Sequence, residues 1–184
     1  MFRFDNYCEE WAKKFRPISH DPNIGSKEKR FYRMNYYQEL NTLCTNLNMA
    51  KSPAMAVATQ IEAETEGKTS KFLRHSLKVY FLVRQESSAI AVGAASELNA
   101  AAAKAEGYEL AEKFLAYISA DKNGIKDDQG NLLSPANPDL HGLVLDRAEI
   151  FTAPSIYGNW WVTALIIENI TQRQLCVNRE EYDF

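Results

Sequence analysis

The sequence predicts an α+β fold: a mostly antiparallel sheet of about four strands with helices packed on it, in the order α-α-β-β-α-β-β. Three observations support this fold class. Segments with apolar residues at every third or fourth position, as in helices, precede and separate segments in which apolar and polar residues alternate, as in strands. Two alternating segments are joined by a short glycine-containing connection, as in an antiparallel hairpin. The length of 184 residues suits one domain, expected over 27–170, with extensions over 1–26 and 171–184.

The first extension and the start of the domain are expected to be helical. Tyr7, Trp11 and Phe15 recur every four positions, which predicts a helix over 4–16 that ends before Pro17. A loop follows, and a second helix is expected over 27–49. Its first turns carry a cluster of basic residues, namely Lys27, Lys29, Arg30 and Arg33. This cluster is either a solvated helix face or a contact with an acidic partner.

A β-hairpin is expected over 54–84. Residues 54–65 and 72–84 alternate between apolar and polar side chains, so each strand has one covered face and one wet face. Matching the covered faces puts Thr59 and Leu77 on the same side of the sheet. It also places the acidic residues Glu62 and Glu64 near the basic residues Arg74 and Lys78.

The second half of the domain is expected to contain one long helix and two strands. The helix covers 94–119, with an apolar stripe formed by Leu98, Ala101, Ala105, Tyr108, Leu115 and Ile118. Gly107 predicts at most a slight bend. Glycine, proline and asparagine over 121–142 indicate a long loop, often an interaction element. Strands are expected over 143–152 and 158–170, and the last is apolar on both faces, which predicts a central position in the sheet.

Composition and charge exclude several classes of protein. Hydrophobic residues make up 46% of the chain and charged residues 24%, which excludes a mainly disordered chain. The net charge of −3 does not fit a dedicated duplex-DNA binder. The isolated cysteines, Cys8, Cys44 and Cys176, predict reduced thiols and no disulfide framework. No apolar run approaches the ~20 residues that span a membrane, and no signal peptide is recognisable, so we expect a protein made in the cytoplasm without a membrane partner.

No catalytic, cofactor-binding or metal-binding constellation is recognisable. The histidines are far apart in sequence, and the acidic residues of 121–132 fail the EF-hand pattern, with Ile125, Lys126 and Leu132 at positions that require an oxygen ligand, glycine and glutamate. There is no GxSxG elbow, Cys–His signature, P-loop or GxGxxG motif. We therefore expect a protein that is not an enzyme and has no cofactor. Basic and aromatic residues over 27–37 leave binding of a nucleic-acid strand open.

The pattern of elements resembles a family of phage proteins. The resembling parts are the helix over 27–49, the strand entry from Ser52 to Val57, the strand segment from Ser76 to Val83, the helix over 95–119, and the block from Ile150 to Trp160 that leads into a last strand ending at Ile167. Over about 27–170 the chain resembles the tail-terminator, tail-completion and head–tail connector proteins, which form neck and tail rings. The loop 121–142 and the helix 4–16 are additions to that pattern.

The resemblance implies a structural subunit of a homo-oligomeric ring, commonly six-fold, that stacks on neighbouring ring or tail proteins in a virion. DNA would meet it only by passing through the ring lumen. We expect contacts through both extensions and through surface aromatic and basic residues, namely Phe4, Tyr7, Trp11, Arg30, Arg33, Trp161, Tyr182 and Phe184. The helix 4–16 is too short to be stable alone, so it docks either on its own domain or on a neighbour. The competing hypotheses are a cytoplasmic adaptor or nucleic-acid-binding module, and an enzyme with an unrecognised site.

Overall fold

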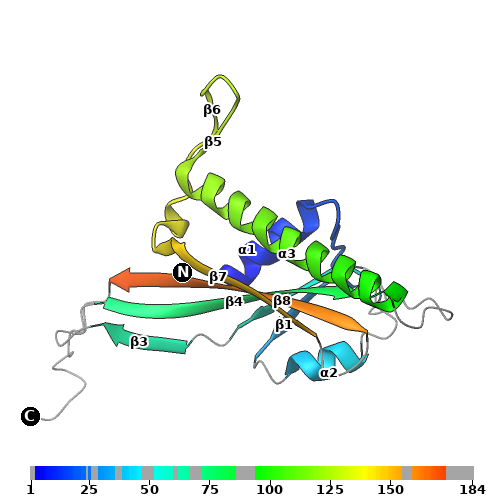
Figure 1. Ribbon diagram of the computed structural model, residues 1–184. Helices are drawn as coiled ribbons and strands as arrows, with labels where there is room; N and C mark the ends of the chain where they lie inside the picture. Colours follow the sequence, from blue (N-terminus) through cyan, green and yellow to red (C-terminus); the bar gives the residue numbers. More distant parts are fainter. Residues whose placement is uncertain are drawn as a thin grey trace, which may run out of the picture.

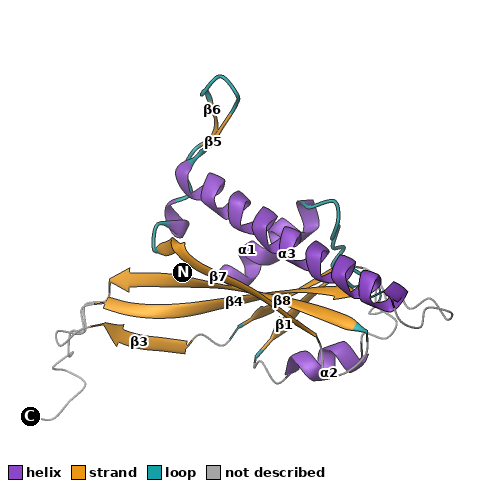
Figure 2. Ribbon diagram, in the orientation of Figure 1, coloured by secondary structure: helices purple, strands orange, loops and turns teal. Residues whose placement is uncertain are grey.

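The chain folds as an α+β domain with one mixed sheet and helices on both of its faces (Figures 1 and 2). This computed structural model describes residues 3–23, 25, 29–35, 39–46, 52–59, 62–66, 72–85, 94–154 and 159–172. The strands of the sheet are β1 (Phe31–Met34), β2 (Ala54–Ala58), β3 (Glu62–Glu66), β4 (Phe72–Arg84), β7 (Leu143–Pro154) and β8 (Trp160–Gln172). Their order is β1-β2-β4-β8-β7, with β3 also paired to β4. All neighbours are antiparallel except β1 and β2.

Strand β1 replaces the first part of the helix predicted over 27–49, so that prediction was wrong. Among the described residues of this segment, helix α2 covers Glu39–Asn46. Phe31 pairs with Met55 in a parallel register, and the backbone N–H of Met55 donates to Arg30 O at 2.8 Å. Phe31 and Met34 are buried. Aromatic residues form helices weakly, and here the edge of the sheet supplies hydrogen bonds and apolar cover that a solvated helix would lack.

Helix α1 (Phe4–Lys14) confirms the helix predicted over 4–16 and docks on its own domain. Cys8 and Trp11 are buried. The Trp11 ring lies 4.7 Å from that of Phe114 in α3 and 6.2 Å from that of Phe81 in β4, measured between ring centroids. The first extension is therefore part of the main hydrophobic core.

The predicted hairpin is formed, but its first strand is divided. Strand β4 has the predicted bounds, whereas 54–65 splits into β2 and β3. Val57 pairs with Val79 and Ala63 with His75, so six positions along the first strand match four along β4. The two extra residues preserve the alternation, and Glu64 stands opposite Arg74 as predicted. Thr59 lies just beyond the end of β2, where its hydroxyl donates to Met34 O at 3.0 Å. The strand register therefore does not test the prediction that Thr59 and Leu77 lie on the same face of the sheet.

The face of the hairpin predicted to be wet is partly covered by α2. A second buried cluster lies there, formed by Met34, Leu40, Cys44, Ala54, Ala56, Tyr80, Leu82, Trp160, Val162 and Ala164. Figure 2 shows α2 on one side of the sheet and α1 and α3 on the other. The central position predicted for the last strand is confirmed, because β8 lies between β4 and β7 and is covered on both faces.

Helix α3 (Ala94–Asn123) is longer than predicted and buries a different face. Its buried residues are Ala103, Gly107, Leu110, Ala111, Phe114 and Ile118. The predicted stripe was wrong over its first half, since Leu98 is 71% exposed and Tyr108 is 44% exposed. The reason is Gly107: a Cβ there would lie 2.5 Å from Thr163 Oγ1 of β8, so only glycine allows this close approach of α3 to the sheet.

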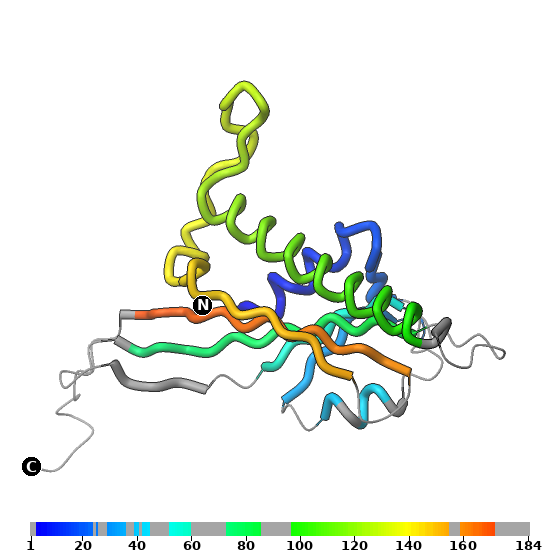
Figure 3. The backbone as a smooth tube through the Cα atoms, viewed as in Figure 1, coloured from blue at the N-terminus to red at the C-terminus, as the bar shows by residue number. Residues whose placement is uncertain are grey.

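The segment 121–142, predicted as a loop, contains a small hairpin. Strands β5 (Ile125–Lys126) and β6 (Leu132–Ser134) pair with each other, and a 3-10 turn, η2 (Pro138–Leu140), leads back to β7. Figure 3 shows this hairpin leaving the end of α3 and pointing away from the sheet. We call residues 124–136 the arm. None of the helices within the described residues is long and apolar enough to cross a membrane.

Candidate functional site

Most of the aromatic residues predicted to contact partners lie within the chain's own domain. Phe4 and Trp11 are buried, and Tyr7 is half-buried with its hydroxyl donating to Asp121 Oδ2 at 3.0 Å. Trp161 is half-buried, and its indole N–H donates to Gln85 Oε1 at 3.3 Å. The remaining two, Tyr182 and Phe184, lie outside the described residues. Of the two alternatives for helix α1, docking on its own domain or on a neighbouring subunit, its aromatic residues show the first.

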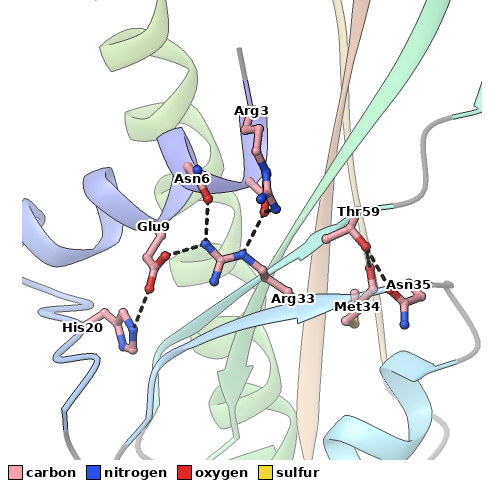
Figure 4. Close-up of polar contacts among 9 residues, drawn as sticks. Arg3, Asn6, Glu9, His20, Arg33, Met34, Asn35 and Thr59 are labelled. Atoms are coloured by element: carbon pink, nitrogen blue, oxygen red, sulfur yellow. Dashed lines mark hydrogen bonds and ion pairs between the residues drawn. The ribbon is translucent and has the colours of Figure 1, made fainter. Parts of the chain in front are cut away.

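The predicted basic contacts are also internal. Arg30 donates to Pro17 O at 2.8 Å. Arg33, from β1, donates to three side chains of α1: Asp5, Asn6 and Glu9 (Figure 4). We call Arg33 and these three partners the α1–β1 cluster. It ties the first extension to the edge of the sheet, which explains the basic charge at Arg33 without an acidic partner protein.

The charges of the α1–β1 cluster are tightly matched. Burial alone would raise the pKa of Asp5, but hydrogen bonds and charge from Arg3 and Arg33 outweigh it and lower that pKa. Burial opposes the charge of Arg33, yet Glu9 and Asp5 together raise its pKa. The side chains of Asp5 and Glu9 are only 9% and 18% exposed. Removing Arg33 would therefore leave two poorly solvated carboxylates.

His20 lies beside this cluster and is buried. Its Nε2 is 3.7 Å from Glu9 Oε1, and its Nδ1 has no hydrogen-bond partner among the described residues. Burial lowers the pKa of His20 more than Glu9 raises it, which favours the neutral imidazole at pH 7. The ring packs 5.7 Å from that of Phe31, between centroids. Within the described ranges no three His, Cys, Asp or Glu residues are grouped so that they could hold a metal ion. The cluster is thus arranged to join α1 to β1.

The arm is fixed at its base and at its tip. At the base, the backbone N–H of Asn137 donates to Asp121 O at 2.8 Å, and its side-chain amide donates to Asp121 Oδ2 at 3.1 Å. Gly124 turns the chain there with φ +87°, a conformation that favours glycine. At the tip, the Asp127 carboxylate accepts from the backbone N–H groups of Gln129 and Asn131 at 2.9 and 2.8 Å. The arm therefore projects with its own internal hydrogen bonds.

The arm carries two large apolar side chains into solvent. Leu132 is 59% exposed and Leu133 is 68% exposed. The Asp127 carboxylate is held by the turn itself: hydrogen bonds from the Asn131 side chain and backbone, and from backbone N–H groups nearby, lower its pKa. Exposed apolar side chains on a strand next to a pre-organised turn are typical of an interaction element.

A shallow groove lies between α3 and β7. It has a volume of about 410 Å³ and is lined by Ala101, Lys104, Ala105, Tyr108, Glu109, Glu112 and Thr152. We call these residues the α3–β7 groove. Its floor is apolar, formed by alanines and the Tyr108 ring, and its rim is charged. Leu98 continues the same helix face one turn before Ala101. This face is the stripe that the sequence pattern assigned to the core.

Exposed apolar residues therefore gather mainly at two places far apart in the fold. Of the large hydrophobic side chains that are exposed among the described residues, Leu98 and Tyr108 lie on α3, and Leu132 and Leu133 on the arm. Phe151, the remaining one, pairs with Ala164 in the register and so lies on the sheet face that α2 covers. The sequence predicted a loop and a possible interaction element over 121–142, but neither the hairpin nor the role of Leu132 and Leu133, although adjacent leucines between turn residues were a visible signal.

Residues of β4, β7 and β8 form a polar surface of mixed charge on the sheet. Arg74, Lys78, Arg147, Glu149 and Glu168 line a cavity of about 380 Å³ there. Arg74 Nη1 lies 3.5 Å from Glu168 Oε1. Cations and carboxylates are interspersed, which does not favour a nucleic-acid backbone as the occupant.

Comparison with known protein families and with curated protein sequences gives no match to this chain.

Proposed function

We propose that the chain is a non-enzymatic structural subunit that assembles with copies of itself into a ring, at the tail or head–tail junction of a phage or phage-like particle. The role is that of a tail-terminator, tail-completion or neck ring protein. The protein would be made in the cytoplasm of the bacterial host and would reside in the virion, in contact with neighbouring ring or tail proteins.

One observation supports the proposed self-association: exposed apolar side chains gather on two different surfaces, the arm and the α3 face that contains the groove. Such patches favour protein–protein contacts. Contacts between two different surfaces of the same chain are head-to-tail, and they close into a ring when the rotation between subunits permits. The phage location rests on the resemblance in the pattern of elements. The hairpin, the long helix and the final strands of that pattern support it, whereas the helix expected over 27–49 does not, because β1 takes the place of its first part.

The test is the mass of the full chain in solution, measured by light scattering during size-exclusion chromatography over a range of concentrations. The proposal expects one species whose mass is a fixed multiple of 20.9 kDa. Antibody labelling of particles from the source should then place the chain at one end of the tail. A monomer at every concentration, absent from particles, contradicts the proposal and favours the adaptor hypothesis.

A further inference from the structure

We propose that the arm of one subunit seats in the α3–β7 groove of the next copy, with Leu132 and Leu133 covering Ala101, Ala105 and Tyr108. This inference rests on the proposed homo-oligomer and names the surfaces that would join its subunits.

The arm cannot reach the groove of its own chain. Tyr108 lies fifteen residues before the end of α3 at Asn123, about 22 Å along the axis at 1.5 Å per residue. Figure 1 shows the arm leaving that end of α3 and pointing away from the sheet. The hydrogen bonds of Asn137 to Asp121 hold the base of the arm in this direction. A second copy of the chain is therefore the occupant that we infer, because it supplies both an arm for the groove and a groove for the arm.

The chemistry of the two surfaces is complementary. Alanines at 101 and 105 leave room beside the Tyr108 ring for branched side chains such as leucine. The rim of the groove carries exposed Lys104 and Glu112, and the arm carries exposed Lys126 and Asp128. The groove also contains Glu109, which pairs with Lys113 at 2.6 Å, and the arm also contains Asp127, which accepts hydrogen bonds within its own turn. The charges that can meet across the contact are therefore Lys104 and Glu112 of the groove and Lys126 and Asp128 of the arm. Opposite charges at the rim favour one orientation of the docked arm.

The arm is also suited to bind without further ordering. Its tip is closed by Asp127 and its base by Asp121, so little conformational freedom is lost when its leucines are covered. The contact joins different surfaces of two copies, so each subunit still offers a free arm and a free groove after one contact has formed. This is the head-to-tail arrangement that a ring requires.

The experiment uses three variants of the full chain. The arm variant is Leu132→Ser with Leu133→Ser, and the groove variant is Ala105→Arg. The matched control is Phe151→Ser, because Phe151 is also an exposed apolar residue but lies outside both the arm and the groove. Arginine is a good helix former and Ala105 is exposed, so the groove variant should fold normally, as its unfolding temperature will check. The expected result is that the arm and groove variants each weaken self-association by about 100-fold or more in dissociation constant. Phe151→Ser should associate as the unchanged chain does.

Mixing the variants gives the sharper test. The arm variant keeps its groove and the groove variant keeps its arm, so an equal mixture should form 1:1 heterodimers while each variant alone stays monomeric. Native mass spectrometry of isotopically labelled variants detects this pairing. If both variants assemble like the unchanged chain, or if the mixture forms no heterodimer, the arm does not seat in the groove, and the proposed ring must use another interface. If the unchanged chain is itself monomeric, both this inference and the proposed ring are wrong.

Discussion

Gly107 offers a quantitative test of how α3 packs on the sheet. Replacing it with alanine adds one methyl carbon, which would lie 2.5 Å from Thr163 Oγ1 and 3.4 Å from Thr163 Cβ. Thr163 is fully buried, and its hydroxyl lies 2.8 Å from that of Thr152. The neighbouring atoms therefore cannot swing into solvent, and the helix or the strand must shift.

Two opposing effects set the size of the change. Alanine in place of glycine favours a helix by about 1 kcal/mol. Overpacking a buried site costs roughly 1–3 kcal/mol, and losing the hydrogen bond between Thr152 and Thr163 costs about 1 kcal/mol more. We expect Gly107→Ala to lower the free energy of unfolding by about 1–3 kcal/mol in total.

Urea denaturation followed by tryptophan fluorescence measures this change. A double-mutant cycle with Thr163→Ala isolates the contact, because removing the hydroxyl makes room for the new methyl group. The second change should cost less in the Gly107→Ala background than in the unchanged chain. Exposed Ala102→Gly serves as the control for helix propensity alone. If Gly107→Ala instead stabilises the protein by the helix-propensity gain, α3 does not approach β8 as closely as described.

Four further changes test the packing, the polar contacts and the arm. Trp11→Ala should cost about 3–5 kcal/mol in unfolding free energy, measured by urea denaturation, because α1 is part of the core; a loss below 1 kcal/mol would mean that α1 is not docked. Arg33→Gln should cost about 1 kcal/mol or somewhat more, since the half-exposed guanidinium pairs with the poorly exposed carboxylates of Asp5 and Glu9. Lys13→Gln removes only a pair with the exposed Glu10 and should change little in the same assay. His20 has a lowered pKa in the folded state, so the unfolded chain binds more protons as the pH falls through about 6.5, and stability should decrease from pH 7 to pH 5. His20→Gln should show a flatter profile in thermal unfolding, and an unchanged profile would contradict the burial of His20. Asp127→Ala should speed amide hydrogen exchange at the arm tip without changing the unfolding temperature. Acidification below about pH 4 should have the same effect, because the Asp127 carboxylate, whose pKa is lowered by its hydrogen bonds, stabilises the turn only while it is charged.

The elements predicted well are those with a strong local signal. The helix from Phe4 to Lys14 follows from aromatic residues at every fourth position, and the strand from Phe72 to Arg84 follows from thirteen alternating residues. Both signals depend only on which side chains share a face. The same reasoning gave the pairing of Glu64 with Arg74, because the two extra residues between β2 and β3 preserve the alternation.

The elements predicted wrongly depend on contacts between distant parts of the chain. Residues 31–34 form a strand because β2 lies beside them, and no local pattern distinguishes this from a helix with the same apolar residues. Helix α3 has two apolar stripes, and alanine spacing alone does not decide which one is buried. Gly107 was the available signal, since a glycine in the middle of a strong helix indicates close approach to a neighbouring element.

The candidate surfaces were only partly accessible from the sequence. The aromatic residues of α1 were expected to contact partners, but most of their area covers the core around Trp11 and Phe114. The groove was not predicted from the sequence, because the helix face with Leu98 and Tyr108 was expected to lie in the core. The arm was assigned to a loop, since two short strands around the Asp127 turn have too few residues to show alternation.

Electron microscopy of the purified full-length chain shows directly whether it forms rings. A ring-forming subunit should give closed rings of uniform size with rotational symmetry, and the density should show the hairpin at 124–136 of each subunit in contact with α3 of its neighbour. Single 20.9 kDa particles, or open irregular aggregates without a repeated contact, would contradict the assignment of this chain as a ring-forming subunit.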